Sequence, residues 1–366
     1  MHTDVAIIGG GIAGLSCAAA IGPDATVVVL EAESTIGYHA TGRSAALYTE
    51  CYGSPVIRRL ARASKEYLTV IHPELSSPRG LIFVAPKGDS EALDDLEGDF
   101  GSLVTGLRRL GPSEVEQACN LFPVSLVEGG VFEPDARDID VDALLTSFAR
   151  NARSKGSTIL TRATITSLTR HGARWRIVAG AHELTADVVV NAAGAWGDRV
   201  AALAGVISLG LQPFARSVFT FDPGTNPQEW PMTIDARERW YMKPEGPLLL
   251  ASGASEIPAE PHDVQPEEID IALGIEKINA ASSLSVRSVK NTWAGLRTFT
   301  PDRSPAVGFD NAVSSFFWLV GQGGYGIKTS PALGRLSAAA ILGREVPQDI
   351  AELGVDAQDL DPVRFR

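Results

Sequence analysis

The sequence predicts an α/β protein in which a second domain, of α+β type, is inserted into a first domain built on a parallel sheet. Three observations lead to this prediction. The apolar runs "DVAII" and "TVVVL" near the N-terminus are continuous, which is typical of parallel strands covered on both faces. Between about residues 211 and 290 the strands alternate apolar and polar residues, which favours an antiparallel sheet. The last part of the chain then returns to a strand, a glycine turn and a helix.

The overall composition indicates a globular protein with more than one domain. Its 366 residues exceed the roughly 250 to 300 at which a single hydrophobic core stops growing. A net charge of −12 argues against a nucleic-acid-binding face, which would be basic. No apolar run reaches the ~18 residues of a membrane span, and the N-terminus begins on strand-like sequence without a secretory signal. The expected location is the cytoplasm, with loose docking to the inner membrane left open.

The cysteines predict neither a metal site nor a redox centre. Only Cys17, Cys51 and Cys119 occur, far apart and without a C-x-x-C spacing. This pattern disfavours a disulfide framework, a zinc site and dithiol chemistry. Each cysteine is therefore expected to be a small buried side chain, and no metal is expected.

The first structural unit is a strand, a helix and a second strand. "DVAIIGGG" predicts a buried strand, "IAGLSCAAAI" an apolar helix, residues 22–24 a turn, and "TVVVLE" a second buried strand. A helix is expected next over Val56 to Ile71, followed by the strand "GLIFVA". A further helix is expected to begin after the N-cap Asp140 and to end just before Gly156.

The later elements first repeat this pattern and then depart from it. "TILTRATITSL", "RWRIVAG" and "ADVVVNAAGAW" predict strands with the buried character of the first unit. The next segment contains the alternating strands and a helix opened by Pro266 and Glu267. We therefore expect a first, nucleotide-binding domain made of residues 1–55, 140–210 and 291–366. The second, substrate domain is expected to contain residues 56–139 and 211–290.

A glycine-rich turn between the first strand and helix has the spacing of a dinucleotide-binding loop. "IIGGGIAG" places Gly9, Gly11 and Gly14 in a G-x-G-x-x-G motif, and Glu31 ends the next strand at the expected spacing of about 20 residues. The glycines allow a tight turn, close approach of a pyrophosphate and close helix packing. The Glu31 carboxylate accepts ribose hydroxyls and disfavours a 2′-phosphate, so NAD or FAD is expected. The alternative is an ordinary glycine turn between a strand and a helix.

A second glycine-rich segment favours FAD over NAD. "GYHATGRSAALYTECYG", residues 37–53, directly follows the acid. An NAD dehydrogenase has no use for such a segment there, whereas FAD lies extended and continues to contact the chain beyond its adenosine. "ESTIGYHATGRSAA" resembles the second signature of the glutathione-reductase-like flavoproteins of the D-amino-acid oxidase family. Together with "WYMKP", "TWAGLRTF" and "QGGYGIKTS", it is most similar to the bacterial catabolic D-arginine dehydrogenase group of that family.

The resemblance implies a Rossmann-like domain that binds FAD without a covalent bond, in large part through backbone groups. A helix N-terminus near residues 326–329 is expected to face the flavin pyrimidine and to stabilise its reduced, anionic form. Gly295 stands where the related sarcosine enzymes attach their flavin through a cysteine. The residues assigned to the FAD site by the resemblance are Gly9, Gly11, Ile12, Ala13, Gly14, Glu31, Ala32, Thr41, Gly42, Arg43, Ser44, Ala45, Ala46, Ile165, Ala193, Gly194, Trp196, Gly323, Gly326, Ile327, Lys328 and Thr329.

The implied reaction is the oxidation of a D-amino acid. A hydride passes from Cα to flavin N5, and water then hydrolyses the imino acid to a 2-oxo acid and ammonia. A quinone or a redox protein is the expected electron acceptor. The residues assigned to the small-molecule amino-acid substrate are Arg216 and Arg297 for the carboxylate, Tyr52 and Tyr241 for hydroxyl contacts, Gly324 for the amine, and Leu47 and Leu81 for the side chain. The alternative for each arginine is a surface ion pair, and for each tyrosine a place in the core.

Two departures from the D-arginine dehydrogenase pattern concern the substrate side chain. Leu81 follows "SPR" where the arginine-specific enzymes have a glutamate, and Leu47 stands where they have a histidine. A leucine cannot pair with a guanidinium, which would be left desolvated. Neutral, apolar D-amino acids are therefore expected to be better substrates than D-arginine, unless Glu50 or Glu238 turns inward. His39 is expected to cap a turn rather than to act as an acid or base.

Other functions are open alternatives. The fold also suits a sarcosine- or glycine-oxidase-like amine oxidase, although the oxygen-activating lysine of the sarcosine enzymes is missing from the strand "PLLLASG". A 2-hydroxy-acid dehydrogenase would use the same carboxylate anchor. A flavin-binding scaffold without turnover is disfavoured because both arginines are present. The residues alone do not decide between D and L substrates, the electron acceptor or the oligomeric state.

Overall fold

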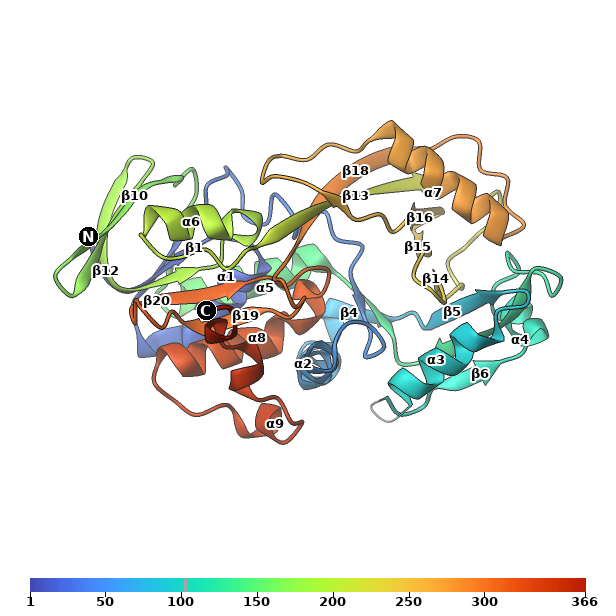
Figure 1. Cartoon of the computed structure of the whole chain (residues 1–366), viewed down its shortest axis with the longest axis horizontal. Coiled ribbons are helices and arrows are strands. Elements are labelled where there is room, and N and C mark those ends of the chain that lie inside the picture. Colours follow the sequence, from blue (N-terminus) through green and yellow to red (C-terminus); the bar gives the residue numbers. More distant parts are fainter. Residues whose placement is uncertain (102–103) are drawn as a thin grey trace.

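The computed structural model describes residues 1–101 and 104–366, which form an α/β protein with two large sheets and one small sheet. Figure 1 shows the first large sheet, with β1 (His2–Ile8) and β12 (His182–Asn191), on the left and most of the second on the right. The long strands β13 (Gln212–Phe221) and β18 (Asn291–Phe299) run between them. None of the helices in the described part of the chain combines the length and apolar character that a membrane span needs.

The first sheet has eight strands, in the order β10-β11-β12-β1-β2-β9, with β20 beside β12 and β19 beside β20. As expected, β1 pairs in parallel with β2 and with β12. The expectation that β10 and β11 share the buried character of the first unit was wrong, because β10 is largely exposed and β11 alternates exposed with buried residues. Both pair antiparallel within a β10-β11-β12 meander. Their connections are too short for the crossover that parallel strands require. The other strands of this sheet are β2 (Val27–Leu30), β9 (Thr158–Leu160), β10 (Ile165–His171), β11 (Arg174–Ala179), β19 (Ala306–Phe309) and β20 (Phe316–Val320).

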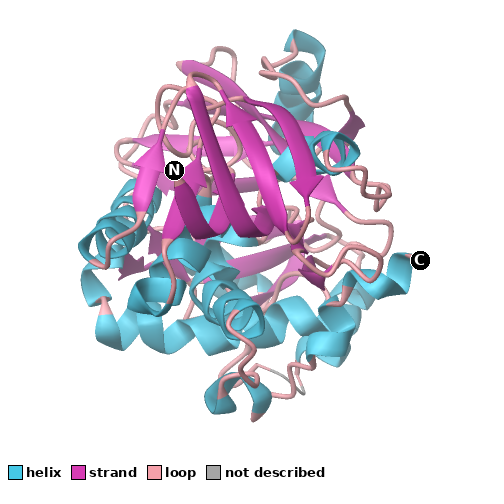
Figure 2. Ribbon diagram, turned by 90° about the vertical axis from the view of Figure 1, so that its left-hand side faces the viewer, coloured by secondary structure: helices cyan, strands magenta, loops and turns pink. Residues whose placement is uncertain are grey.

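One face of the first sheet is covered by a layer of helices, which lies below the strands in Figure 2. The helices are α1 (Ile12–Ile21), α2 (Pro55–Glu66), α5 (Val141–Ser154) and α8 (Gly326–Ile341), and α6 (Gly197–Leu203) packs on the other face. The predicted N-cap of α5 is confirmed, because the Asp140 carboxylate accepts a hydrogen bond from the Ala143 N–H at 2.9 Å. The helix expected over Val56 to Ile71 corresponds to α2 and to the π-helical turn Tyr67–Ile71 that follows it.

The second sheet has nine strands, in the order β17-β13-β16-β15-β14-β5-β7-β6, with β18 beside β13. Its pairs are antiparallel, as predicted, except for the parallel pair of β14 and β5. The helix expected after Pro266 is α7 (Glu268–Ala281), with Glu267 as its N-cap. The remaining elements of this region are β5 (Leu81–Pro86), β6 (Arg108–Leu110), β7 (Val127–Glu133), β14 (Met232–Asp235), β15 (Tyr241–Glu245), β16 (Leu248–Ser252), β17 (Ile257–Pro258), α3 (Ser90–Phe100) and α4 (Pro112–Ala118).

Two segments connect the sheets more closely than the proposed division into domains implies. β18 comes from residues 291–366, but it pairs with β13 over nine residue pairs. Helix α2 comes from residues 56–139 apart from its first residue, but it packs against α8 under the first sheet. The small third sheet contains β3 (Leu47–Tyr48), β4 (Ser76–Pro78) and β8 (Arg137–Ile139), and α9 (Gln348–Ala351) follows α8 near the C-terminus. The division itself stays a proposal.

Candidate cofactor and substrate site

A cavity of about 680 Å³ is lined by residues of both large sheets. It runs from the glycine-rich turn after β1 to the strands β13, β15 and β18. The predicted site residues that line it are Gly9, Gly11, Ile12, Ala13, Glu31, Ala32, Thr41, Arg43, Ser44, Ala45, Ile165, Ala193, Gly194, Trp196, Arg216, Tyr241, Arg297, Gly323, Gly324, Gly326 and Ile327. One continuous space therefore joins the residues expected to bind the cofactor to those expected to bind the substrate.

The glycine-rich turn has no room for side chains at two of its motif positions. Gly9 has φ +113°, and a Cβ on it would lie 2.3 Å from the carbonyl oxygen of Ala192. A Cβ on Gly14 would lie 2.0 Å from the carbonyl oxygen of Gly9, although Gly14 itself does not line the cavity. The turn therefore needs glycine for its own geometry, and it leaves the N-terminus of α1 facing the cavity, where backbone N–H groups favour an anion.

Glu31 is buried at the end of β2 with both carboxylate oxygens near the turn. Oε2 accepts a hydrogen bond from the Gly10 N–H at 2.8 Å, and Oε1 accepts one from the Glu33 N–H at 2.9 Å. Each carboxylate oxygen has a further lone pair, so both keep the capacity to accept a ribose hydroxyl. The Thr41 hydroxyl accepts from the Ile12 N–H at 3.1 Å and so joins the second glycine-rich segment to the start of α1.

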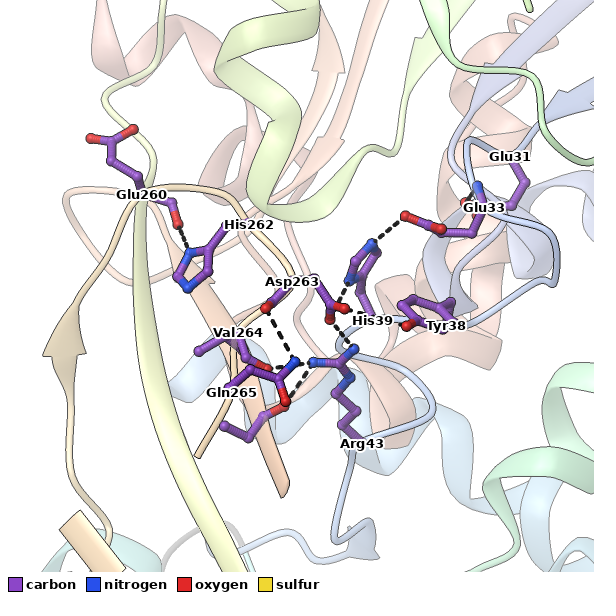
Figure 3. A network of polar contacts seen from close by, with 11 residues as sticks. Glu31, Glu33, Tyr38, His39, Arg43, Glu260, His262, Asp263, Val264 and Gln265 are labelled. Carbon is purple, nitrogen blue, oxygen red and sulfur yellow. Dashed lines mark hydrogen bonds and ion pairs between the residues drawn. The ribbon is translucent and has the colours of Figure 1, made fainter. Parts of the chain in front are cut away.

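The second glycine-rich segment is attached to the loop before α7 by a group of four side chains, Tyr38, His39, Arg43 and Asp263, which we call the Asp263 clasp (Figure 3). Arg43 pairs with Asp263, and its Nη1 also donates to the carbonyl oxygens of Val264 at 2.9 Å and Ala294 at 3.1 Å. The Tyr38 hydroxyl donates to Asp263 at 3.3 Å. The Arg43 guanidinium is thus committed to protein groups, which fits the expectation that this segment contacts FAD through its backbone.

His39 lines the cavity, and sequence reasoning had left it out of the site. Its Nε2 lies 2.9 Å from a carboxylate oxygen of Glu33, and its ring packs against Trp196 with 4.5 Å between the ring centroids. His262 and Val264 also line the cavity and were missed. They come from the loop before α7, more than 200 residues after the glycine-rich segments, and no local motif marks them.

Arg216 and Arg297 lie on the neighbouring strands β13 and β18. Arg216 is opposite Gly295 and Arg297 is opposite Phe214, so the two arginines are diagonal neighbours on the same face of the sheet. Burial and the nearby positive charge of Arg297 lower the pKa of Arg216. The closeness of two guanidinium groups in a cavity wall favours an anionic ligand between or beside them.

The two arginines differ in the hydrogen-bond and ion-pair partners that the protein gives them. Arg216 donates from Nε to the Ser255 carbonyl oxygen at 2.8 Å and from Nη2 to the Ala254 carbonyl oxygen at 3.1 Å, and Glu256 lies 3.5 Å from Nη2. Arg297 donates from Nη1 to the Tyr52 hydroxyl at 3.3 Å. Among residues 1–101 and 104–366, no carboxylate forms an ion pair with Arg297. Arg297 is therefore the guanidinium that is better placed to receive an external carboxylate.

The aromatic residues near Arg297 come from three separate segments. Tyr52 packs against Tyr325 with 5.1 Å between ring centroids, and Tyr241 is buried on β15 at the cavity wall. A Cβ on Gly324 would lie 2.9 Å from Nη1 of Arg297, so glycine allows the guanidinium to lie against this backbone. Glu238 is also close: desolvation raises its pKa, while Arg216 and Arg297 act in the opposite direction.

Leu47 and Leu81 do not line the cavity. Leu81 is fully buried, because it begins the inner strand β5, where Met232 and Glu133 flank it. Leu81 belongs to the hydrophobic cluster that also contains Tyr241, and Leu47 packs against this cluster, so both lie behind the cavity wall. Glu50 is buried too, and it accepts a hydrogen bond from the Tyr48 hydroxyl at 2.7 Å.

Several predicted cofactor residues also do not line the cavity. The Gly42 N–H closes a turn on the Gly37 carbonyl oxygen at 2.7 Å, and Ala46 packs in the core. The Thr329 hydroxyl donates to the Tyr325 carbonyl oxygen at 3.0 Å. The Lys328 ammonium donates to carbonyl oxygens of the segment that carries Tyr52. Gly42 therefore supports the segment through its backbone, and Thr329 and Lys328 support neighbouring backbone through their side chains.

Comparison with known proteins agrees with this architecture. A family described as "DAO: FAD dependent oxidoreductase" matches residues 4–340. "FAD-dependent oxidoreductase domain-containing protein 1" of Xenopus laevis is 24% identical over 402 residues, which cover 93% of this chain and 79% of that protein. Glycine oxidase of Bacillus licheniformis is 25% identical over 362 residues, or 95% of each chain. The crystal structure of L-proline dehydrogenase from P. horikoshii has a TM-score of 0.87 at 21% identity, over 100% of this chain and 98% of that one.

The match to the family covers most of the chain and includes both sheets. The cavity supplies what FAD requires, namely a glycine turn without side chains, a helix N-terminus and a carboxylate beside it. FAD is therefore the cofactor, and the chain belongs to the DAO family of FAD-dependent oxidoreductases.

Proposed function

We propose that this protein is a dehydrogenase that oxidises D-amino acids, with Arg297 as the principal anchor of the substrate carboxylate. The observation that carries the proposal is a guanidinium at the cavity wall that has a tyrosine hydroxyl beside it and no carboxylate partner among the described residues. A charge-assisted, bidentate pair with a carboxylate would satisfy it. Bound FAD supplies the acceptor for the hydride that leaves the substrate Cα.

The chain's own residues orient the substrate in this proposal. Arg297 and Arg216 bind the carboxylate, and the hydroxyls of Tyr52 and Tyr241 donate further hydrogen bonds to it. The Gly324 carbonyl oxygen accepts from the amine. The diagonal placement of the arginines supports these roles, because one small anion can contact both side chains. The imino acid then leaves and is hydrolysed by water to a 2-oxo acid and ammonia.

The preference for neutral D-amino acids is part of the proposal. Its support is the hydrophobic cluster behind Tyr241, which contains Leu47, Leu81 and Val218, with Val218 at the cavity wall. Glu238 is a nearby acid that opposes this preference, since it lies within electrostatic range of both arginines. A quinone or a redox protein is the proposed electron acceptor.

An amine oxidase of the glycine oxidase type is the second candidate, and the B. licheniformis relative favours it. The strand β16, which would carry an oxygen-activating lysine, contains no lysine and reads "LLLAS".

Position 295 is a glycine, and Cys17, Cys51 and Cys119 are buried away from the cavity lining, which supports non-covalent FAD. Acid precipitation should therefore release all the flavin as FAD, and flavin left in the pellet would contradict this.

The test of the proposal is anaerobic bleaching of the flavin with a matched panel of compounds. The panel contains D- and L-leucine, glycine, sarcosine and D-2-hydroxy-4-methylpentanoate, which is the hydroxy acid with the leucine side chain. The expected result is fast bleaching with D-leucine alone. Faster bleaching with glycine or sarcosine would favour the second candidate, as would peroxide production in air at the rate of dye reduction.

A further inference from the structure

Two buried charges of opposite sign lie on either side of the segment 49–52. Lys328, in the first turn of α8, is 3% exposed, and Glu133, the last residue of β7, is 1% exposed. The two side chains bind the segment between them rather than each other. This segment connects β3 to the residues before α2 and includes Tyr52.

The two charges hold complementary groups of the segment. Lys328 Nζ donates to the carbonyl oxygens of Thr49 and Tyr52, both at 2.8 Å. Glu133 accepts a hydrogen bond from the Glu50 N–H at 2.8 Å and another from the Thr49 hydroxyl. The cation therefore binds carbonyl groups, and the anion binds an N–H and an O–H. The segment is fixed by charge-assisted hydrogen bonds at both ends, which are stronger than neutral ones.

Burying the charges of Lys328 and Glu133 costs free energy, so their position beside the segment 49–52 suggests a role for them there. An ammonium group in the first turn of a helix opposes the positive end of the helix dipole. Burial lowers the pKa of Lys328 to about 8, although the Glu133 charge acts to raise it. Burial also raises the pKa of Glu133. Buried charges of this kind have been retained in some proteins for conformational specificity rather than for stability.

Lys328 joins one wall of the cavity to the segment that contains Tyr52. Its neighbours Gly326 and Ile327 line the cavity at the start of α8. Its Nζ lies 5.5 Å from the ring centroid of Tyr52, whose hydroxyl is 3.3 Å from Nη1 of Arg297. A displacement of Lys328 would therefore move the tyrosine that contacts the proposed carboxylate anchor.

We propose that Lys328 and Glu133 are positioning residues that hold the segment 49–52 so that the Tyr52 hydroxyl stays beside Arg297. Neither residue contacts the substrate in this proposal; both set the affinity for its carboxylate through Tyr52. The inference rests on the proposed function, because it takes Arg297 as the carboxylate anchor.

The test is a double-mutant cycle on the FAD-loaded enzyme, with 4-methylpentanoate as the probe because it is leucine without the amine. Its Kd is measured from the change in the flavin absorbance spectrum. Lys328→Met is expected to raise this Kd about tenfold in the native background and by less than about twofold in the Tyr52→Phe background. KM for D-leucine should follow the same pattern, with kcat changed less than KM. Equal effects of Lys328→Met in both backgrounds would overturn the proposal, as would no effect in the native one.

Controls separate this inference from loss of the fold and from failure of the proposed function. Lys243→Met removes another buried lysine, whose Nζ lies 3.1 Å from Asp138, and it should leave the Kd unchanged. If Lys328→Met does not fold, Thr49→Val decides the question, because it removes one hydrogen bond to Glu133: a raised Kd supports the proposal and an unchanged Kd overturns it. Arg297→Met tests the anchor separately, since an unchanged Kd in that variant refutes the proposed function instead.

Discussion

The two ends of the cavity are built in different ways. The end beside β1 presents glycine backbone, the N-terminus of α1 and the Glu31 carboxylate, which come from consecutive segments of the chain. The end beside β13 and β18 presents side chains, two arginines and a tyrosine, from strands far apart in the sequence. The first end tolerates few substitutions, because its glycine positions leave no room for a Cβ atom. At the second end, substitution of one side chain can change which ligand binds, because each side chain is held by a different strand and can be replaced without disturbing the others.

The first end should be the more sensitive to a single added methyl group. Gly9→Ala places a Cβ 2.3 Å from the Ala192 carbonyl oxygen and strains a backbone with φ +113°. The expected result is purified protein with little or no bound FAD, measured as the ratio of flavin absorbance to protein absorbance. Gly88→Ala is the matched control, since Gly88 has φ +87° and nothing within 4 Å of the added Cβ. Equal flavin content in both variants would refute the idea that Gly9 is limited by space.

At the second end, Arg297→Met should cause the largest loss in catalysis. Truncating one partner of a buried charge pair costs about 2 to 5 kcal/mol, so kcat/KM for D-leucine should fall by at least about thirtyfold. Arg216→Met should lower kcat/KM less, because the Arg216 guanidinium already donates hydrogen bonds to the carbonyl oxygens of Ser255 and Ala254. Arg335→Met, which breaks a surface pair with Asp349, is the control. A greater loss for Arg216→Met than for Arg297→Met would reverse the assignment.

The side-chain preference should be a smaller effect. A guanidinium that is desolvated beside apolar side chains costs at least about 1.4 kcal/mol, so kcat/KM should be about tenfold higher for D-leucine than for D-arginine. Glu238→Gln should widen this ratio, because it removes the acid near the two arginines. The measurement is kcat/KM for both substrates in both proteins. A native enzyme that prefers D-arginine would show that Glu238 outweighs the apolar cluster.

The Asp263 clasp should give the smallest effect, since partly exposed ion pairs contribute about 0 to 1 kcal/mol. Asp263→Asn should speed FAD release by a few fold at most, measured by the return of free-flavin fluorescence after dilution. The hydrogen bond from Arg43 lowers the pKa of Asp263. The contribution of the clasp should therefore be complete above about pH 4 and should be lost as the pH falls through the lowered pKa. An effect of Asp263→Asn that grows with salt concentration would contradict an ion pair.

The differences between the two ends of the cavity also explain which site residues could be predicted from the sequence. Gly9, Gly11 and Glu31 were found because the turn, the helix and the next strand are consecutive, so spacing alone places them together. Arg216 and Arg297 were assigned only through resemblance, since their proximity depends on the pairing of β13 with β18 across about 80 residues. The contact of Asp263 with Arg43 has no local signal at all.

Side-chain direction was the least predictable property. Lys328 stands in a segment whose neighbours line the cavity, but its side chain turns toward Thr49 and Tyr52. Leu81 follows a recognisable "SPR" triplet, but the inner position of β5 buries it behind the wall. In both cases the long-range packing of another element decides where the side chain points, and a pattern of neighbouring residues does not contain that information.

The pairing of β13 with β18 also has an evolutionary consequence. The offset between Arg216 and Arg297 is set by a ladder of backbone hydrogen bonds, which is indifferent to the side chains around it. Substitutions in the loops and in the apolar cluster can therefore change the accepted side chain over many generations while the spacing of the two guanidinium groups stays constant. If the proposed function holds, an ancestor with this strand pair and both arginines would already have had a carboxylate site, and its descendants could diverge in substrate without rebuilding that site.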